Sequence, residues 1–269
     1  MTSLGIDRDP TARSILDADE PHPLELYNPD GTSDFLLICE HAGRMIPRSL
    51  GTLGLSEEDR QRHIAWDIGA RSVAVALSAR LGAPLFMQRY SRLVCDCNRR
   101  PDVPNFVPEI SETTSIPGNM NLTELERQAR ADAVFAPFHA AIAEALDMRR
   151  MEARRTFIVS IHSFTPVFMG VARPWELGVL YNRDRIFAPE IARRLQETTS
   201  HFVGINEPYS VGDDTDYALP VHGEARNLPC VEFEIRNDLI GDAAAAEKWA
   251  DLLAAVVAQA ASEISSLRP

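Results

Sequence analysis

The sequence predicts an α/β protein of three layers, in which a mostly parallel or mixed central sheet carries helices on both faces. Two segments, 35–39 and 156–162, are runs dominated by aliphatic, aromatic and β-branched residues, as expected of strands buried on both faces. Amphipathic stretches with a helical period separate such runs, including 66–81, which ends at Gly82, and the alanine-rich segment 243–263. Strands that alternate with helices along a chain form α/β layers.

Local signals place the remaining elements. Ser56 is followed by three acidic residues, which is typical of a helix start. Thr123 and Glu126 form a capping box that begins a long helix toward Arg150. Pro137 is expected to interrupt this helix, because proline lacks the backbone N–H and clashes with the preceding turn. A further helix is predicted at 188–198, and further strands at 85–87, 93–95, 178–181 and 230–235.

The chain is expected to form one large domain. Its 269 residues fit a single α/β domain, and no linker-like stretch divides them. Residues 1–32 are predicted to be an N-terminal arm, and 33–269 the domain itself. The segment 101–119 holds four prolines, as expected of a long loop that forms the wall or lid of a site. A second loop, rich in glycine and aspartate, is expected at 204–216.

Composition narrows the classes of partner. A net charge of −12, from 39 acidic and 27 basic residues, argues against nucleic acid and anionic membranes, because both bind positive surfaces. No apolar run approaches the ~18 residues of a membrane span, and residues 1–23 lack the apolar stretch of an export signal. The cysteines are expected to be small buried residues in a reducing cytoplasm, at positions Cys39, Cys95, Cys97 and Cys230.

Two histidines stand at the ends of the two buried strands. His162 ends the strand 156–162, and His41 comes two residues after the strand 35–39. In an open α/β sheet, ligands bind in the crevice beyond the carboxyl ends of the strands. His41, His162 and Asp67, at the start of a helix, supply the two nitrogens and one oxygen of a catalytic zinc site. The alternative is that each histidine is only hydrogen-bonded at a strand end.

The last strand carries charged residues at alternate positions. Its apolar side chains share one face, and Glu232, Glu234 and Arg236 share the other. This face is either solvated or, if the strand is central, part of a site, because a buried carboxylate is costly unless it is paired or functional. In the second case, Glu234 is the carboxylate base that a zinc hydrolase requires.

Six short motifs follow one another along residues 33–260. They are Glu40-His41-Ala42-Gly43, Ala65-Trp66-Asp67-Ile68-Gly69, the segment 90–99, the segment 137–141, His162-Ser163-Phe164 and the segment 232–236. In this order they resemble the N-formylglutamate amidohydrolase family, which is similar in fold to the zinc exopeptidases and to the aspartoacylase-type deacylases. The resemblance implies a zinc-exopeptidase-like fold, one Zn²⁺ ion, and hydrolysis of the amide bond of N-formylglutamate or a similar N-acyl amino acid, which releases the amino acid and a small carboxylic acid.

The resemblance also assigns residues to the substrate. In the related deacylases an Asn-Arg pair holds the substrate's α-carboxylate, and Asn98 and Arg99 match this pair. Arg92 is then either a second carboxylate contact or a structural partner of Asp96.

Three residues farther along the chain are expected near the substrate. His139 is either a pocket residue or, judged by its apolar neighbours alone, a hydrogen-bonded core histidine. His222 is expected to donate to a substrate carbonyl or carboxylate, and Arg226 to bind the second carboxylate of a glutamate-like substrate. The other histidines are predicted to lie on the surface, at His22, His63 and His201.

One position departs from the related exopeptidases. There, a glutamate ligand follows the first histidine by three residues, whereas this chain has Arg44 at that position. Asp67 is therefore expected to be the third ligand. Three alternative functions remain open: another N-acyl-amino-acid deacylase or carboxypeptidase-like enzyme, a non-catalytic metal-binding protein of the same fold, and a metal-free α/β protein.

Overall fold

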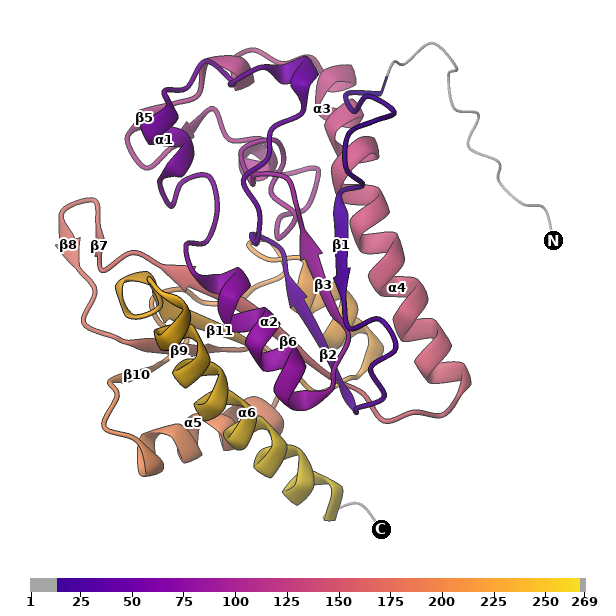
Figure 1. Ribbon diagram of the computed structural model, residues 1–269, viewed down its shortest axis with the longest axis vertical. Helices are drawn as coiled ribbons and strands as arrows, with labels where there is room; N and C mark the ends of the chain where they lie inside the picture. The colour runs from indigo at the N-terminus through magenta and orange to yellow at the C-terminus, as the bar shows by residue number, and fades with distance from the viewer. Residues whose placement is uncertain (1–13, 267–269) are drawn as a thin grey trace.

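The computed structural model describes residues 14–266 and shows a seven-stranded sheet between two layers of helices (Figure 1). The predicted α/β class is therefore confirmed. The first 13 residues of the expected N-terminal arm lie outside the described residues, and the rest of that segment includes a short strand, β1. No helix between residues 14 and 266 is long and apolar enough to cross a membrane.

The regular elements have the following bounds. The main sheet contains β1 (Leu24–Tyr27), β2 (Phe35–Cys39), β3 (Leu85–Gln88), β6 (Phe157–Phe164), β9 (Leu177–Leu180), β10 (Val203–Ile205) and β11 (Cys230–Arg236). Two small hairpins are formed by β4 (Ile110–Ser111) with β5 (Thr114–Ser115) and by β7 (Val167–Phe168) with β8 (Val171–Ala172). The α-helices are α1 (Glu57–Gln61), α2 (Ala70–Leu81), α3 (Glu124–Arg130), α4 (Ala136–Met151), α5 (Phe187–Thr198) and α6 (Ala243–Ser266).

The strand order of the main sheet is β1-β3-β2-β6-β11-β9-β10. The four strands β3, β2, β6 and β11 run parallel to one another. The edge strand β1 is antiparallel to β3, and β9 is antiparallel to β11. Because β2, β6 and β11 are adjacent and parallel, their carboxyl ends meet at one edge of the sheet, where α/β proteins bind ligands.

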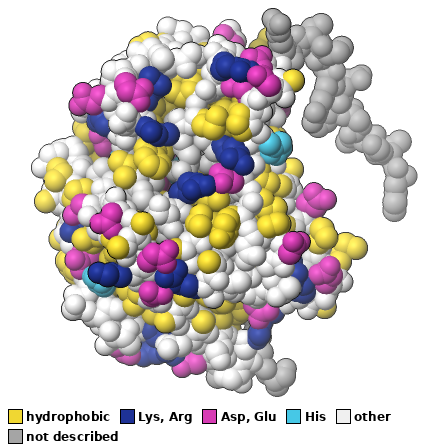
Figure 2. All heavy atoms as spheres, in the orientation of Figure 1, with side chains coloured by type: hydrophobic (Ala, Val, Ile, Leu, Met, Phe, Trp, Pro, Cys, Tyr) yellow, Lys and Arg dark blue, Asp and Glu magenta, His cyan; other side chains and the backbone are white. Residues whose placement is uncertain are grey.

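A hydrophobic core fills the space on each side of the sheet. On one side, α2, α5 and α6 bury apolar residues such as Val73, Ile191 and Leu253 against the strands. On the other side, α4 and the chain before it bury Phe138 and Ile142. Figure 1 shows α2 and α6 crossing in front of the sheet, while α4 lies along its other side. Figure 2 shows acidic and basic side chains interspersed on the face nearest the viewer, so the excess of acid forms no single patch there.

The long helix is interrupted where the sequence predicts. Residues Ala131–Phe135 form one widened π-helical turn directly before α4, in which Pro137 occupies the first turn. This fits a proline that has no N–H to continue the α-helical ladder. The helix expected from residue 66 starts later, at Ala70, because Gly69 adopts the left-handed conformation with φ of 83°.

Two predictions about strands are wrong. The segment 93–95 is a turn, because the Ser91 hydroxyl accepts a hydrogen bond from Leu93 N and the Leu93 carbonyl accepts one from Asn119. Conversely, the expected loop 204–216 begins inside strand β10, which pairs with β9 in parallel. The second error arises from long-range strand pairing, which a local pattern does not encode, whereas the first arises from side-chain contacts of Ser91 and Asn119.

One face of the central strands changes from apolar to polar along their length. Alternate residues of a strand share a face, and here each strand begins apolar and ends with a group able to carry charge or bind a metal. The residues on that face are Leu36, Ile38 and Glu40 along and just after β2, Ile158, Ser160 and His162 in β6, and Cys230, Glu232 and Glu234 in β11. The core therefore ends where the polar site begins.

Candidate metal and active site

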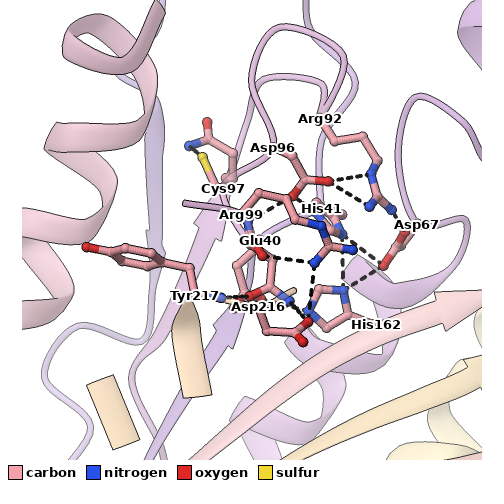
Figure 3. A network of polar contacts seen from close by, with 12 residues as sticks. Glu40, His41, Asp67, Arg92, Asp96, Cys97, Arg99, His162, Asp216 and Tyr217 are labelled. Atoms are coloured by element: carbon pink, nitrogen blue, oxygen red, sulfur yellow. Dashed lines mark hydrogen bonds and ion pairs between the residues drawn. The ribbon is translucent and has the colours of Figure 1, made fainter. Parts of the chain in front are cut away.

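Three buried side chains converge at the carboxyl ends of β2 and β6. The Nδ1 atoms of His41 and His162 lie 3.1 Å apart. Asp67 Oδ2 lies 2.8 Å from Nδ1 of His162 and 3.4 Å from Nδ1 of His41. Figure 3 shows the two imidazoles and this carboxylate pointing toward one another. The structure therefore brings together the three residues that the sequence predicts as ligands, and their donor atoms form a group able to hold a metal ion.

The spacing of these donors fits a tetrahedral ion. Zinc binds nitrogen and carboxylate oxygen at about 2.0–2.2 Å, so two ligands of a tetrahedral site lie about 3.3 Å apart. The separations of 3.1, 2.8 and 3.4 Å among His41, His162 and Asp67 are close to that value. Two nitrogens and one oxygen also match the ligand set of catalytic zinc. The residues present therefore fit the metal that the family resemblance implies.

A carboxylate lies behind each imidazole, on the side away from the other donors. Nε2 of His41 donates to Asp96 Oδ1 at 2.7 Å, and Nε2 of His162 lies 3.0 Å from Glu40 Oε2. A proton held on Nε2 leaves the lone pair on Nδ1, which faces the other donors. This arrangement is the one in which a second carboxylate orients a metal-binding histidine and increases its basicity.

Backbone contacts fix Asp67 between the two strands. Its amide donates to the carbonyl of His41, and its Oδ2 accepts from Ser163 N at 3.2 Å. The side chain of Ser163 in turn donates to the carbonyl of Ile68. The loop between β2 and α2 is thereby attached to the end of β6, which holds the carboxylate in place.

Negative charge accumulates at this site. Every buried carboxylate in the part of the chain that the structure describes lies here, at Glu40, Asp67, Asp96, Asp216, Glu232 and Glu234. Although burial opposes a charged imidazole, Glu232 and Glu40 outweigh it and raise the pKa of His162 well above its usual range. The surroundings thus favour positive charge at the point where the three donors meet.

Arg92 balances part of this charge. Its guanidinium contacts Asp96 Oδ2 at 2.7 Å and lies 3.4 Å from Asp67 Oδ1 (Figure 3). Although burial favours the neutral acid, Arg92 and His41 hold the pKa of Asp96 well below its usual range. Of the two roles expected for Arg92, these contacts match the structural partner of Asp96.

Glu234 faces the same site from β11. It stands directly opposite His162 in the register of the parallel strands. Its Oε2 is buried and has no hydrogen-bond partner among the described residues, and burial raises the pKa of its carboxyl well above the usual range. Glu232, two residues earlier, instead contacts the amide of Asn98 at 3.4 Å and lies 3.8 Å from Nε2 of His162, on the side away from the three donors. Glu40 also has an oxygen without a partner, Oε1, but its Oε2 accepts from Ser160 and lies behind His162, whereas Glu234 lines the cavity.

A cavity of about 340 Å³ opens onto these groups. Its lining includes six of the ten residues that the sequence assigns to the metal, the base or the substrate. These are His41, Arg92, Asn98, Arg99, His162 and Glu234, and the loop residues Tyr209, Ser210, Thr215 and Asp216 complete the wall.

Asn98 and Arg99 line this cavity in different ways. Both polar atoms of the Asn98 side chain have partners inside the protein. Oδ1 accepts from Tyr217 N and Ala218 N, and Nδ2 lies near the carboxylates of Asp216 and Glu232. Arg99 is held only through Nη1, by the carbonyls of Asn98 and Thr215 and by Asp216 at 3.3 Å. The other guanidinium nitrogens of Arg99 remain available for a ligand.

Three expected substrate residues do not line the cavity. His139 and His222 form a buried pair, with 2.9 Å between Nδ1 and Nε2, and His139 also donates to the carbonyl of Cys97. Arg226 pairs with Asp147 at 2.6 Å. The interpretation of His139 as a core histidine therefore matches its place in the structure, and His222 and Arg226, expected near the substrate, lie outside the lining of this cavity.

A model of the N-formylglutamate amidohydrolase family matches residues 33–241. The chain belongs to the N-formylglutamate amidohydrolase family. As a member of this family, it is a hydrolase that acts on amide bonds.

Solved structures agree with this assignment. A gene product of Agrobacterium tumefaciens is 39% identical to the amidohydrolase, with a TM-score of 0.90 over 93% of this chain and 99% of its own. An N-formylglutamate amidohydrolase from Ralstonia eutropha is 18% identical, with a TM-score of 0.66 over 92% of this chain and all of its own, and it supports the fold. None of the curated proteins matches the sequence.

The amidohydrolase site contains one histidine that the sequence places elsewhere. His63 was predicted to lie on the surface, but it lines the cavity with Nε2 3.8 Å from Asp67 Oδ1, so that prediction is wrong. Burial lowers its pKa to about 4, which keeps it neutral near pH 7. The turn 62–66 places it there, and no local pattern marks it.

Two supporting carboxylates stand inside motifs that are visible in the sequence. Glu40 and Asp96 stand inside the motifs Glu40-His41-Ala42-Gly43 and Asp96-Cys97-Asn98-Arg99, although the sequence gives neither of them a role toward a histidine. Both prove to contact the Nε2 atoms of the two imidazoles.

Proposed function

We propose that this amidohydrolase is a zinc-dependent enzyme that hydrolyses the amide bond of N-formylglutamate or a similar N-acyl amino acid. The observation that carries the proposal is the convergence of His41, Asp67 and His162 at separations typical of tetrahedral zinc, beside the unpartnered oxygen of Glu234. The similarity to the N-formylglutamate amidohydrolase of Ralstonia eutropha supports the choice of substrate.

His41, Asp67 and His162 would hold the ion through Nδ1, Oδ2 and Nδ1. Bound zinc supplies a Lewis acid for the amide carbonyl, lowers the pKa of water, and favours the ionised form of a nearby carboxylate. Asp96 and Glu40 keep the protons of the two imidazoles on Nε2, so that both Nδ1 atoms are free to coordinate.

Glu234 is the general base and then the general acid. Its free oxygen accepts a proton from the attacking water as the C–O bond forms. The same carboxyl then donates this proton to the leaving nitrogen as the C–N bond breaks, which releases an amino acid and a small carboxylic acid. Arg99 binds the α-carboxylate through its free guanidinium nitrogens, and Asn98 fixes the loop that carries it.

The test is Glu234→Gln, assayed with N-formylglutamate beside elemental analysis of the same preparation. Turnover is expected to fall at least ~100-fold, the usual scale of general acid–base catalysis, while bound zinc stays at the wild-type level. Glu247→Gln, an exposed glutamate of α6, is the control for loss of one carboxylate. Full activity of Glu234→Gln would reject the assignment. A panel of N-formyl, N-acetyl and N-succinyl glutamate then identifies the acyl group.

We also propose that the protein works in a reducing cytoplasm. All four cysteines are free and buried in the described structure, where burial raises the pKa of those at 39, 97 and 230. Inert thiols of this kind are typical of intracellular proteins.

A further inference from the structure

Three arginines are buried in the part of the chain that the structure describes, and one of them is unlike the others. Arg130 donates to the carbonyls of Val94 and Gly118 and to the side chain of Asn119. Arg149 donates to the carbonyls of Ser33 and Phe35.

Arg173, only 8% exposed, has neither a carbonyl nor a carboxylate partner among the described residues. Its Nη1 is buried with no hydrogen-bond partner, and no carboxylate of the described residues lies within ion-pair distance of it. Burying a charged guanidinium without a partner is costly, so it requires an explanation.

Aromatic rings surround this guanidinium. Its Cζ lies 4.4 Å from the ring centre of Phe168, 4.8 Å from that of Tyr209 and 5.8 Å from that of Phe164. Cation–π contacts at such distances stabilise the charge in part, but they leave the N–H donors of Nη1 unused. Arg173 follows β8, and its amide donates to the carbonyl of Pro166, which closes the β7–β8 hairpin.

The rings on Arg173 also belong to the wall of the active site. Tyr209 lines the cavity that holds His41, His162 and Glu234. Phe168 and Tyr209 together line an adjoining cavity of about 290 Å³, which shares Arg92 and Arg99 with the first. Arg173, whose Nη1 has no partner, therefore contacts rings that line the space that the substrate would occupy.

We propose that Arg173 is a specificity-determining residue that binds the side-chain carboxylate of an acidic N-acyl amino acid. The carboxylate approaches between the rings of Phe168 and Tyr209 and accepts two N–H bonds from the guanidinium, whose forked donors suit a carboxylate. This inference rests on the proposed function, in which Arg99 takes the α-carboxylate. It replaces Arg226, which is paired with Asp147, as the residue for the second carboxylate.

The contacts of Arg92 support the assignment of one substrate carboxylate to Arg99 and the other to Arg173. Arg92 is already paired with Asp96 and lies close to Asp67, so these carboxylates offset its charge and occupy its donors. A substrate with two carboxylates needs two available cations, and these are Arg99, which lines the cavity, and Arg173, which contacts two of the aromatic residues that line it or the adjoining cavity. A substrate with an uncharged side chain would leave Arg173 unpaired, which gives a reason for selectivity.

The test compares Arg173→Met with the wild type on N-formylglutamate and on N-formylglutamine, which differ only in the charge of the side chain. Methionine keeps an apolar chain between the rings and removes the cation. We expect kcat/KM for N-formylglutamate to fall about 10- to 100-fold, the usual range for a charged hydrogen bond, and that for N-formylglutamine to change less than about threefold. The matched control is Arg149→Met, a buried arginine far from the cavity, which is expected to lower stability without changing the ratio of the two substrates.

Equal losses on both substrates, or no loss on either, would overturn the role of Arg173 while leaving the proposed function intact. If the wild type hydrolyses neither compound, the proposed function fails instead, and binding of glutarate and of butyrate by calorimetry still tests Arg173. The wild type should then bind the dianion more tightly, and Arg173→Met should lose that preference. Arg173→Lys provides a second variant, in which the charge is kept, should the methionine variant fold poorly.

Discussion

His41 and His162 bring their Nδ1 atoms within 3.1 Å of each other, although 121 positions separate them along the chain. A carboxylate lies on the far side of each ring, Asp96 in a hydrogen bond with His41 and Glu40 at 3.0 Å from Nε2 of His162. Lone pairs directed at one point repel unless a proton or a metal ion lies between them. The two histidines are therefore arranged for a cation, and the following predictions test what that cation is and what holds it.

Purified protein is expected to contain about one divalent ion per chain, measured by elemental analysis. His162→Gln should retain less than a tenth of this metal, because the loss of one of three protein ligands leaves an incomplete site. Treatment of the wild type with a chelator should abolish amide hydrolysis, and added zinc should restore it. His201→Gln, outside the site and stacked on Trp249, is the control. A full complement of metal in His162→Gln would contradict the assignment.

Asp96→Asn is expected to weaken zinc binding about 10- to 100-fold, although Asp96 is not a ligand. The amide is a weaker acceptor for the Nε2 proton of His41, so the ring loses both its orientation and part of its basicity. Competition with a chromogenic chelator measures the affinity. Asp102→Asn, an exposed aspartate paired with Arg100, should bind zinc like the wild type. Equal affinities in all three proteins would show that Asp96 does not support the ligand.

Gly69→Ala is expected to lower the free energy of unfolding by about 2 kcal/mol or more, measured by urea denaturation. Gly69 has φ of 83°, and an added Cβ would lie 2.5 Å from the carbonyl oxygen of Ile240. The loop that carries Asp67 should shift as well, so zinc affinity should fall. Gly241→Ala is the matched control, because a Cβ there meets no atom within 4 Å. Comparable stabilities of the two variants would refute this account.

His139 and His222 should make stability depend on pH. Burial lowers their pKa values to about 4 and about 3, so both are neutral in the folded protein, whereas in the unfolded chain they gain a proton near pH 6.5. Their stabilising effect is therefore complete above pH 6.5. It is lost as the pH falls toward 4, by about 1.4 kcal/mol per pH unit for each histidine.

The measurement is the free energy of unfolding between pH 7 and pH 4.5, in the wild type and in the double variant His139→Gln, His222→Gln. The double variant should be less stable at pH 7, because the pair packs in the core, but its stability should fall less steeply with acid. Parallel pH curves for the two proteins would mean that these histidines are not buried in neutral form. Because both proteins contain the same carboxylates, the titration of these groups affects both pH curves alike and drops out of the comparison.

The parts of the site that follow from strand direction were predictable. His41, His162 and Glu234 stand at the ends of strands, and the carboxyl ends of adjacent parallel strands meet at one edge. The buried, unbroken runs at 35–39 and 156–162 identified two of those strands, and the fold class followed from their alternation with helices.

The parts that depend on contacts across the fold were not predictable. The identity of the carboxylate behind each imidazole depends on ring orientation, which no spacing encodes. Arg226 is expected from the sequence to bind a substrate carboxylate, but it pairs with Asp147 of α4, which lies 79 positions earlier in the chain. Arg173 carried no signal at all, because a single arginine after a short hairpin resembles any surface residue until its burial is known.

The order of β2, β6 and β11 along the chain also sets the order in which a ribosome makes the site. His41 and Asp67 are made first, and His162 follows about halfway between them and the strand that carries Glu234. All three residues of the candidate metal-binding group are therefore synthesised before Glu234, the proposed base. An ion bound by this group in a nascent chain would have no base beside it until the last strand joined the sheet.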